Sequence, residues 1–193
     1  MSCEPKICPT CGGAWLRSDR PNADMEEIFW PLFDTEVVMA KDRRLFFGQW
    51  DAAGRVKSLN ETNMCQAGTL AAPQEFKCLG LRWMTNVAAE EAASFLSLST
   101  IDIGIGRQPV LRSRASAIPI GKLEEIIYDP ESPRNRWIMS PNLPTWSLAF
   151  SLRWGEVIQA ILEWPSAALL PNPRESFKLR LVFVGHLFVP RRW

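Results

Sequence analysis

The arrangement in this chain that is most typical of metal chemistry is Cys8-Pro-Thr-Cys11-Gly-Gly, near the N-terminus. Two cysteines separated by two residues and followed by glycine are typical of a zinc knuckle, because the turn directs both thiolates at one ion. A structural zinc ion takes about four ligands, so Cys8 and Cys11 supply half a site. The remaining candidate ligands, which form no second close pair, are Cys3, Cys65, Cys78 and His186.

Cys8 and Cys11 admit three interpretations. A cluster of Cys3, Cys8 and Cys11 would bind zinc if a ligand from elsewhere completed it. A redox-active pair would require a βαβ context, which the sequence lacks. The incomplete ligand count favours an ordinary or partly oxidised tail. We therefore predict no cofactor and keep zinc at Cys8 and Cys11 as the alternative.

Catalysis by a histidine would have to use His186, because the chain contains 1 histidine. The strand alternation places it on the same apolar face as Val182, Val184 and Phe188, a setting typical of a structural histidine. No partnered nucleophile is evident, and the acidic residues form no Asp-x-Asp pair. We therefore predict that the protein is not an enzyme and has no small-molecule substrate.

The most basic stretch of the chain contains Arg107, Arg112 and Arg114. A phosphate contact is one interpretation, and a solvated or subunit-contacting face is the favoured one. Lys+Arg 22 against Asp+Glu 21 gives a net charge of +1, which argues against a dedicated nucleic-acid binder. The 9 tryptophans exceed what one small core needs, and Trp and Arg are enriched where proteins meet. The predicted interface residues are Trp146, Trp164, Trp193, Arg112 and Arg114.

Short β-strands separated by turn residues must position these side chains. We expect strands over residues 36–40, 44–50, 75–84, 95–105, 123–128, 136–139, 146–154, 157–164 and 177–190, and short helices over residues 23–33 and 87–94. Within residues 75–84, Leu79, Leu81 and Trp83 should share one face, opposite Phe76 and Cys78. Residues 146–154 and 157–164 repeat one apolar parity around Gly155-Glu156, which predicts a hairpin.

The last predicted strand, residues 177–190, is the strongest β signal. Its first half alternates apolar residues with Lys178 and Arg180, so it should have one dry face and one wet face. Its second half is apolar on both faces, which suits a strand that runs into a packed sheet between two neighbours. Pro190 lacks a backbone donor and should end it.

These elements predict an all-β fold, a single jelly roll or β-sandwich of about eight antiparallel strands with short helical insertions. Residues 1–22 form a Cys/Gly/Pro-rich tail, and residues 23–193 form one domain. The odd number of cysteines, 5, favours reduced thiols in a protein made in a cytoplasm. We see no signal peptide and no apolar run long enough to span a membrane.

A set of spaced positions over residues 45–190 resembles the capsid proteins of tailless icosahedral bacteriophages, several of which carry an internal membrane. The positions are Thr62-Asn63, Gly68 to Leu70, Pro73-Gln-Glu-Phe76, Leu143-Pro-Thr-Trp146, and an ending in Phe-x-Leu-x-Leu followed by Gly-x-Leu-Phe-x-Pro. The resemblance implies a single jelly roll that stands upright in a virion shell and builds capsomers through lateral contacts. The implied partners are further copies, other capsid proteins, and an internal membrane or the genome. The tail with Cys8 and Cys11 is outside the pattern.

Our first hypothesis is therefore a self-assembling shell protein. A second is a zinc-knuckle accessory protein that binds nucleic acid through Arg107, Arg112 and Arg114, which stoichiometric zinc and salt-sensitive binding would support. A third is a receptor- or glycan-binding spike domain whose exposed tryptophans stack on sugar, which a glycan-binding test would separate from the first.

Overall fold

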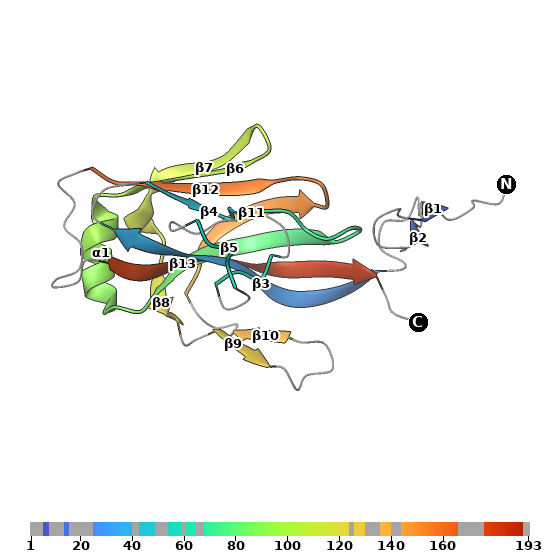
Figure 1. Cartoon of the computed structure of the whole chain (residues 1–193), viewed down its shortest axis with the longest axis horizontal. Coiled ribbons are helices and arrows are strands. Elements are labelled where there is room, and N and C mark those ends of the chain that lie inside the picture. The colour runs from blue at the N-terminus through green and yellow to red at the C-terminus, as the bar shows by residue number, and fades with distance from the viewer. Residues whose placement is uncertain are drawn as a thin grey trace.

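The computed structural model describes residues 6–7, 14–15, 25–39, 43–48, 54–58, 61–64, 68–123, 126–129, 136–139, 144–165 and 176–190. The strands in chain order are β1 (Lys6–Ile7), β2 (Ala14–Trp15), β3 (Met25–Met39), β4 (Arg44–Phe46), β5 (Glu75–Thr85), β6 (Thr100–Ile105), β7 (Gln108–Arg114), β8 (Ile120–Lys122), β9 (Ile126–Asp129), β10 (Arg136–Met139), β11 (Trp146–Arg153), β12 (Ile158–Glu163) and β13 (Ser176–Pro190) (Figure 1). Between them lie the helix α1 (Ala89–Ser97) and the 3₁₀ turn η1 (Ala115–Ala117).

The chain pairs its main strands in a nested order. β3 pairs with β13, β4 with β12, β5 with β11 and β6 with β7, each pair antiparallel. One sheet has the order β11-β5-β13-β3, with β8 added parallel to β5, and the other has the order β4-β12-β6-β7. This connectivity, a long hairpin rolled up into two sheets, is that of a jelly roll. The predicted all-β sandwich of about eight antiparallel strands is confirmed.

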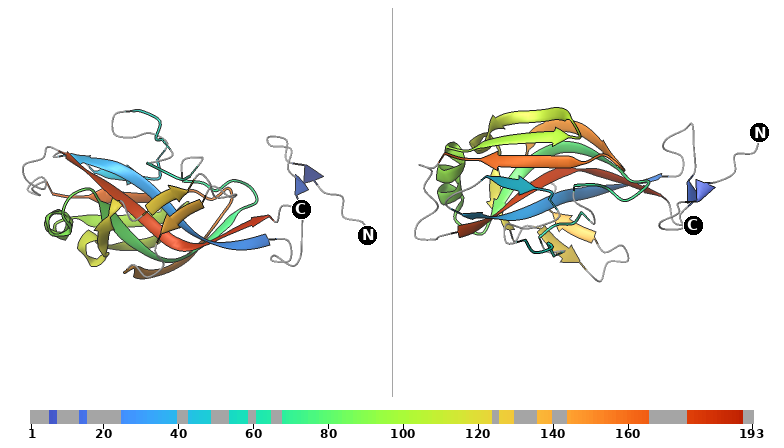
Figure 2. Two further views of the ribbon diagram at one scale, coloured as in Figure 1. Left: turned by 90° about the horizontal axis from the view of Figure 1, so that it is seen from below. Right: turned by 45° about the horizontal axis from the view of Figure 1, so that its top comes forward.

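The two sheets form two layers (Figure 2), and the main hydrophobic core lies between them. Its largest fully buried side chains include Phe46, Trp83, Phe95, Phe177, Phe183, Leu81, Leu96 and Ile101. The Phe46 ring on β4 meets the Trp83 ring on β5 with centroids 5.5 Å apart, which joins the two sheets. The indole N–H of Trp83 donates to the carbonyl of Ala115 at 3.0 Å, so its polar atom is satisfied inside the core.

β13 lies between β5 and β3, as the sequence predicts. Its side chains from Phe177 to Leu187 are almost all buried, and the strand ends at Pro190. One detail of the prediction is wrong, because Arg180 is buried on the face that was expected to be wet.

The helix predicted over residues 23–33 is wrong, because the described residues of that range, 25–33, belong to β3. This strand is the edge of its sheet, where a proline is tolerated because one side needs no ladder donor. Pro31 still accepts a hydrogen bond at its carbonyl, from the Asn63 side-chain amide at 2.5 Å. β3 is buried on both faces over residues 31–36, so the period-two pattern that marks a half-buried strand is absent.

The predicted strand over residues 75–84 is confirmed, but its faces are not. Val184 of β13 pairs with Gly80, and the next residue, Gly185, pairs with Cys78. Leu79 is therefore the extra residue of a β-bulge, and it lies 54% exposed. The bulge reverses the parity, so Phe76 and Cys78 join Leu81 and Trp83 in the core.

The hairpin predicted for residues 146–164 is also wrong. β11 pairs with β5 in one sheet and β12 pairs with β6 and β4 in the other, so the turn at Gly155 crosses between sheets. The shared apolar parity arises because each strand turns one face toward the core between the sheets. The helix predicted over residues 87–94 is present as α1, and it extends to Ser97, so the strand predicted from residue 95 begins at Thr100.

The outer faces of the two sheets differ in character. The four-stranded sheet carries charges that pair within the chain, Arg43 with Glu163 at 3.8 Å and Arg112 with Asp102 at 3.9 Å. The other sheet has a second apolar cluster on its outer face, formed by Phe33, Met84, Val182 and Val184 with Leu123 packed against them. β10 lies against β3 on this side of the molecule (Figures 1 and 2).

Candidate functional site

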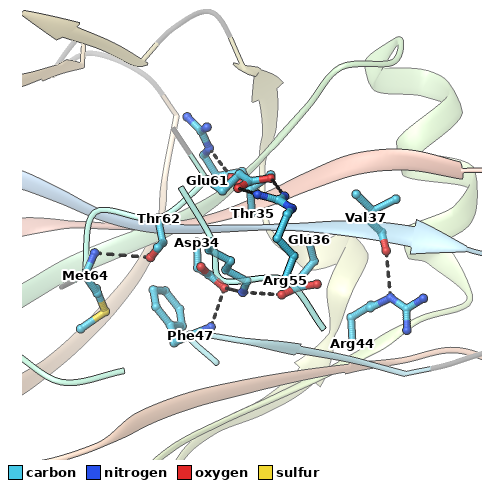
Figure 3. A network of polar contacts seen from close by, with 12 residues as sticks. Asp34, Thr35, Glu36, Val37, Arg44, Phe47, Arg55, Glu61, Thr62 and Met64 are labelled. Atoms are coloured by element: carbon cyan, nitrogen blue, oxygen red, sulfur yellow. Dashed lines mark hydrogen bonds and ion pairs between the residues drawn. The ribbon is translucent and has the colours of Figure 1, made fainter. Parts of the chain in front are cut away.

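A cluster of buried charges lies where the edge strands of the two sheets, β3 and β4, come together. Along β3, Asp34 and Glu36 alternate with the residues of the outer face and so share the core side with Leu32 and Val38. Figure 3 shows both side chains within the network of polar contacts. Both carboxylates are buried, with Asp34 0% and Glu36 2% exposed. Buried carboxylates require compensation, because ions lose their hydration inside a protein.

Lys57 supplies that compensation from the segment of residues 54–58. Its ammonium lies 2.5 Å from Asp34 Oδ2 and also contacts Glu36 Oε1. The backbone N–H of Phe47 donates to the same Asp34 oxygen at 2.6 Å, and Phe47 has a φ of 64°, in the left-handed region. We call Asp34, Glu36 and Lys57 the seam cluster, because they lie at the seam where β3 of one sheet meets β4 of the other.

The seam cluster contains one cation for two carboxylates. Burial raises the pKa of Asp34 above its ordinary value and raises the pKa of Glu36 to about 6, while the Lys57 ammonium opposes both shifts. The Glu36 carboxyl can therefore take up a proton slightly below neutral pH. The ion pairs of Lys57 also attach the segment of residues 54–58 to β3. Among the described residues, no group of three or more His, Cys, Asp or Glu side chains is placed to hold a metal ion.

Residues 61–63, which we call the edge segment, run along the outer edge of β3. The N–H of Thr35 donates to the Glu61 carbonyl at 2.7 Å, and the N–H of Phe33 donates to the Asn63 side chain at 2.9 Å. Glu61 also accepts hydrogen bonds from the Arg55 guanidinium, at 2.5 Å to the nearer oxygen, and from the Ser58 N–H at 2.8 Å. The edge segment thereby covers backbone groups of β3 that another strand would otherwise pair with.

Arg180 of β13 occupies the opposite face of the sheet. Its Nε donates to Thr35 Oγ1 at 2.8 Å, and its guanidinium lies 4.3 Å from the centroid of the Phe33 ring. Burial lowers the pKa of Arg180 to about 10, so the side chain stays charged at neutral pH. Polar side chains therefore lie on both faces of β3.

Stability is expected to be greatest near pH 4.5. The raised pKa of Glu36, about 6, means that its contribution is complete below the ordinary value of 4.5 and is lost as the pH rises through 6. This loss is about 2 kcal/mol, and the raised pKa of Asp34 acts in the same direction. Hydrogen bonds from Arg55 hold the pKa of Glu61 at about 2, so its contribution is present above 4.5 and is lost as the pH falls.

Urea unfolding at several pH values would measure this profile. In Glu36→Gln the decline above pH 4.5 should become shallower, whereas Glu90→Gln, at an exposed position of α1, should keep it. An unfolding free energy that rises in the wild-type protein between pH 4.5 and 7 would contradict the assignment.

The residues predicted to bind metal lie outside the described part of the chain. Cys8 and Cys11 fall between β1 and β2, which pair with each other and with neither large sheet. Cys78 is a free, buried thiol whose pKa burial raises to about 12, so it is unsuited to bind zinc. His186 Nδ1 lies 2.8 Å from Glu27 Oε1 on the outer face of β13.

Four of the five predicted interface residues lie in the described part of the chain, on or next to strands of both sheets. Trp146 and Trp164 are half-buried against the core, and the Trp164 ring meets the Phe95 ring with centroids 5.2 Å apart. Arg112 and Arg114 are exposed on β7, an edge strand. Trp193 lies outside the described residues.

Sequence reasoning missed the seam cluster. The available signal is Leu32 to Val38, where two acids alternate within an apolar run, as on one face of a buried strand. It also missed the exposed Phe29 and Leu79, because the first fell in a predicted helix and the second was assigned to the wrong face.

No helix in the described part of the chain is both long and apolar enough to cross a membrane. Comparison of the chain with models of protein families, with curated proteins and with solved structures gives no match.

Proposed function

We propose that this protein is a capsid subunit, a single jelly roll that self-associates through lateral contacts to build an icosahedral virion shell. The observation that carries the proposal is the nested pairing of eight strands in two sheets. Viral capsid domains, lectins and cupins share this architecture. Because one fold serves many functions, the choice among them rests on where the protein can make contacts.

The surfaces of the sandwich favour the shell. The described interior between the sheets is packed with aromatic and aliphatic side chains, so recognition falls to the outside. β7 and β11 each pair with one strand among the described residues, which leaves both at the edges of their sheets. Phe29 and Leu79 are exposed on the outer face of the five-stranded sheet, and exposed apolar groups of this kind mark contact sites.

The partners that follow are further copies of the chain and other capsid proteins. An internal membrane or the genome would be additional contacts on the inside of the shell. The exposed Arg112 and Arg114 on β7 are suited to phosphate groups or to acidic neighbours.

Two observations favour alternatives. Trp154, at the turn between the sheets, is 44% exposed, which suits a receptor- or glycan-binding spike domain. β1 pairs antiparallel with β2, with Cys8 and Cys11 in the connection between them, which suits a zinc knuckle on a nucleic-acid-binding accessory protein.

We expect the purified protein to form large symmetric assemblies containing many copies of the chain. Light scattering and electron microscopy over a concentration series would measure their mass and symmetry. A protein that stays monomeric at high concentration and enters no particle would contradict the proposal. Stoichiometric zinc with salt-sensitive nucleic-acid binding, or binding to a glycan array that Trp154→Ala abolishes, would favour the corresponding alternative.

A further inference from the structure

The segment of residues 54–58 and the edge segment are held to each other as one unit. Glu61 accepts hydrogen bonds from the Arg55 guanidinium and from the N–H and the hydroxyl of Ser58, the last two at 2.8 Å each. The N–H groups of Glu61 and Thr62 donate to the Ser58 carbonyl at 2.9 and 3.0 Å. We call the two segments together the strap. Because these bonds lie within the strap, we expect its two parts to move together.

The first attachment of the strap follows the outer edge of β3. The N–H groups of Phe33 and Thr35 point outward, where they donate to the Asn63 side chain at 2.9 Å and to the Glu61 carbonyl at 2.7 Å. Because backbone directions alternate along an antiparallel strand, the intervening N–H groups of β3 point toward β13. Release of the strap would therefore expose the outward amides and leave the inward amides paired.

The second attachment is the seam cluster, inside the fold. The strap contributes the ammonium of Lys57, and β3 contributes the carboxylates of Asp34 and Glu36 that it contacts. When both carboxylates are ionised, the closed seam encloses one negative charge in excess, and when one proton is bound the cluster is neutral. An uncompensated ion is costly to keep in the interior, and opening of the strap would let water reach it.

The charged groups around the seam cluster leave this excess in place. Burial is the largest influence on Glu36 and raises its pKa to about 6, against the opposing effects of Lys57 and of Arg44 on β4. Burial also raises the pKa of Asp34. Arg180 of β13 faces β3 from the opposite side of the sheet. The closed seam therefore binds a proton more tightly than solvated carboxylates would.

We propose that the strap is a pH-dependent cover of the β3 edge, closed while the seam cluster holds a proton and opening as that proton is lost. In the closed form the edge segment occupies the outward backbone groups of β3. As the pH rises, the closed form must keep an unpaired carboxylate buried, whereas the open form solvates both carboxylates. Because the strap and β3 belong to one copy of the chain, this device does not depend on the shell function.

Hydrogen exchange resolved to single amides tests the strap. The amides of Phe33 and Thr35 should be less protected than those of Asp34 and Glu36 at every pH, because their exchange requires only the strap to open. Their protection factors, which correct for the intrinsic pH dependence of exchange, should fall at least about tenfold between pH 4.5 and 7. This factor follows from the pKa of Glu36, about 6 in the closed form against an ordinary value of 4.5.

Two variants separate the proton from the hydrogen bonds. Glu36→Gln removes the titrating carboxyl and should lose most of the fall in protection, whereas Glu90→Gln, at an exposed position of α1, should keep it. Asn63→Ala removes the acceptor of the Phe33 N–H. It should lower protection at both pH values and leave the ratio between them as in the wild-type protein.

Three results would overturn the proposal. If the four amides of residues 33–36 have equal protection factors, the strap opens only when the whole protein unfolds. If the protection of Phe33 and Thr35 does not fall between pH 4.5 and 7, the seam cluster does not control the strap. If it falls as far in Glu36→Gln as in the wild-type protein, the proton that matters is bound elsewhere.

Discussion

Replacing Lys57 by methionine is expected to destabilise the protein by about 3–5 kcal/mol. The substitution leaves Asp34 and Glu36 buried without their cation, and neither carboxylate can reach water while the seam between the sheets is closed. Urea unfolding followed by tryptophan fluorescence would measure the loss. Lys178→Met, which removes an exposed lysine from β13, should change the unfolding free energy by less than about 0.5 kcal/mol.

A compensating variant tests the reason for the loss. Lys57→Met combined with Asp34→Asn and Glu36→Gln removes all three charges and should recover most of the stability, because polar isosteres cost less to bury than unpaired ions. The explanation would be wrong if Lys57→Met unfolds no more easily than Lys178→Met. It would also be wrong if the triple variant is as unstable as Lys57→Met alone.

Replacing Gly185 by alanine should destabilise the protein by about 3 kcal/mol. A Cβ at this position would lie 2.1 Å from the Lys77 carbonyl oxygen and 2.8 Å from Cζ of Phe76. Neither group can move away easily, because both belong to β5, the strand hydrogen-bonded to β13 at this bulge. The bulge therefore requires a residue without a side chain.

Gly106→Ala is the matched control for Gly185→Ala. Gly106 has a φ of 58° in the β6–β7 turn, and a Cβ there would meet no atom within 4 Å. Its replacement should cost about 1 kcal/mol, which comes from backbone strain alone. If Gly185→Ala and Gly106→Ala have the same urea midpoint, the close contacts at the bulge do not explain why residue 185 is a glycine.

The elements with a clear period-two pattern were predictable from the sequence. Residues 177–190 alternate in their first half, are almost entirely apolar in their second half and end at a proline, and their strand lies between two neighbours as expected. The strand at residues 146–154 was equally clear, since Leu148, Phe150 and Leu152 turn toward the core. In both cases the apolar residues that mark the strand can be recognised from the local sequence alone.

Features that depend on distant partners were not predictable. β3 lacks the period-two pattern over residues 31–36 because these residues are buried on both faces, and Pro31 is tolerated because the strand is an edge. The bulge at Leu79 arises from the register with β13, a strand about 100 residues away along the chain. Nothing local distinguishes a turn within one sheet from one that crosses between sheets, as at Gly155.

The seam cluster illustrates the same limit for the candidate site. Asp34 and Lys57 are 23 residues apart, and each alone has the composition of an exposed loop or strand residue. Arg180 alternates with apolar residues as a solvated side chain would, yet Thr35 and the Phe33 ring hold it in the sheet. Buried charges become visible only when the partners that compensate them are placed in space.

A ribosome delivers β13 last among the described strands, although this strand lies between β5 and β3 in the finished sheet. Until β13 emerges from the ribosome, β5 and β3 each lack the strand that pairs with them in the finished sheet. Neighbouring chains on one messenger carry the same gap and the same 15-residue strand to fill it. The β13 of one chain would therefore fit the gap of another, which is the geometry of a domain swap.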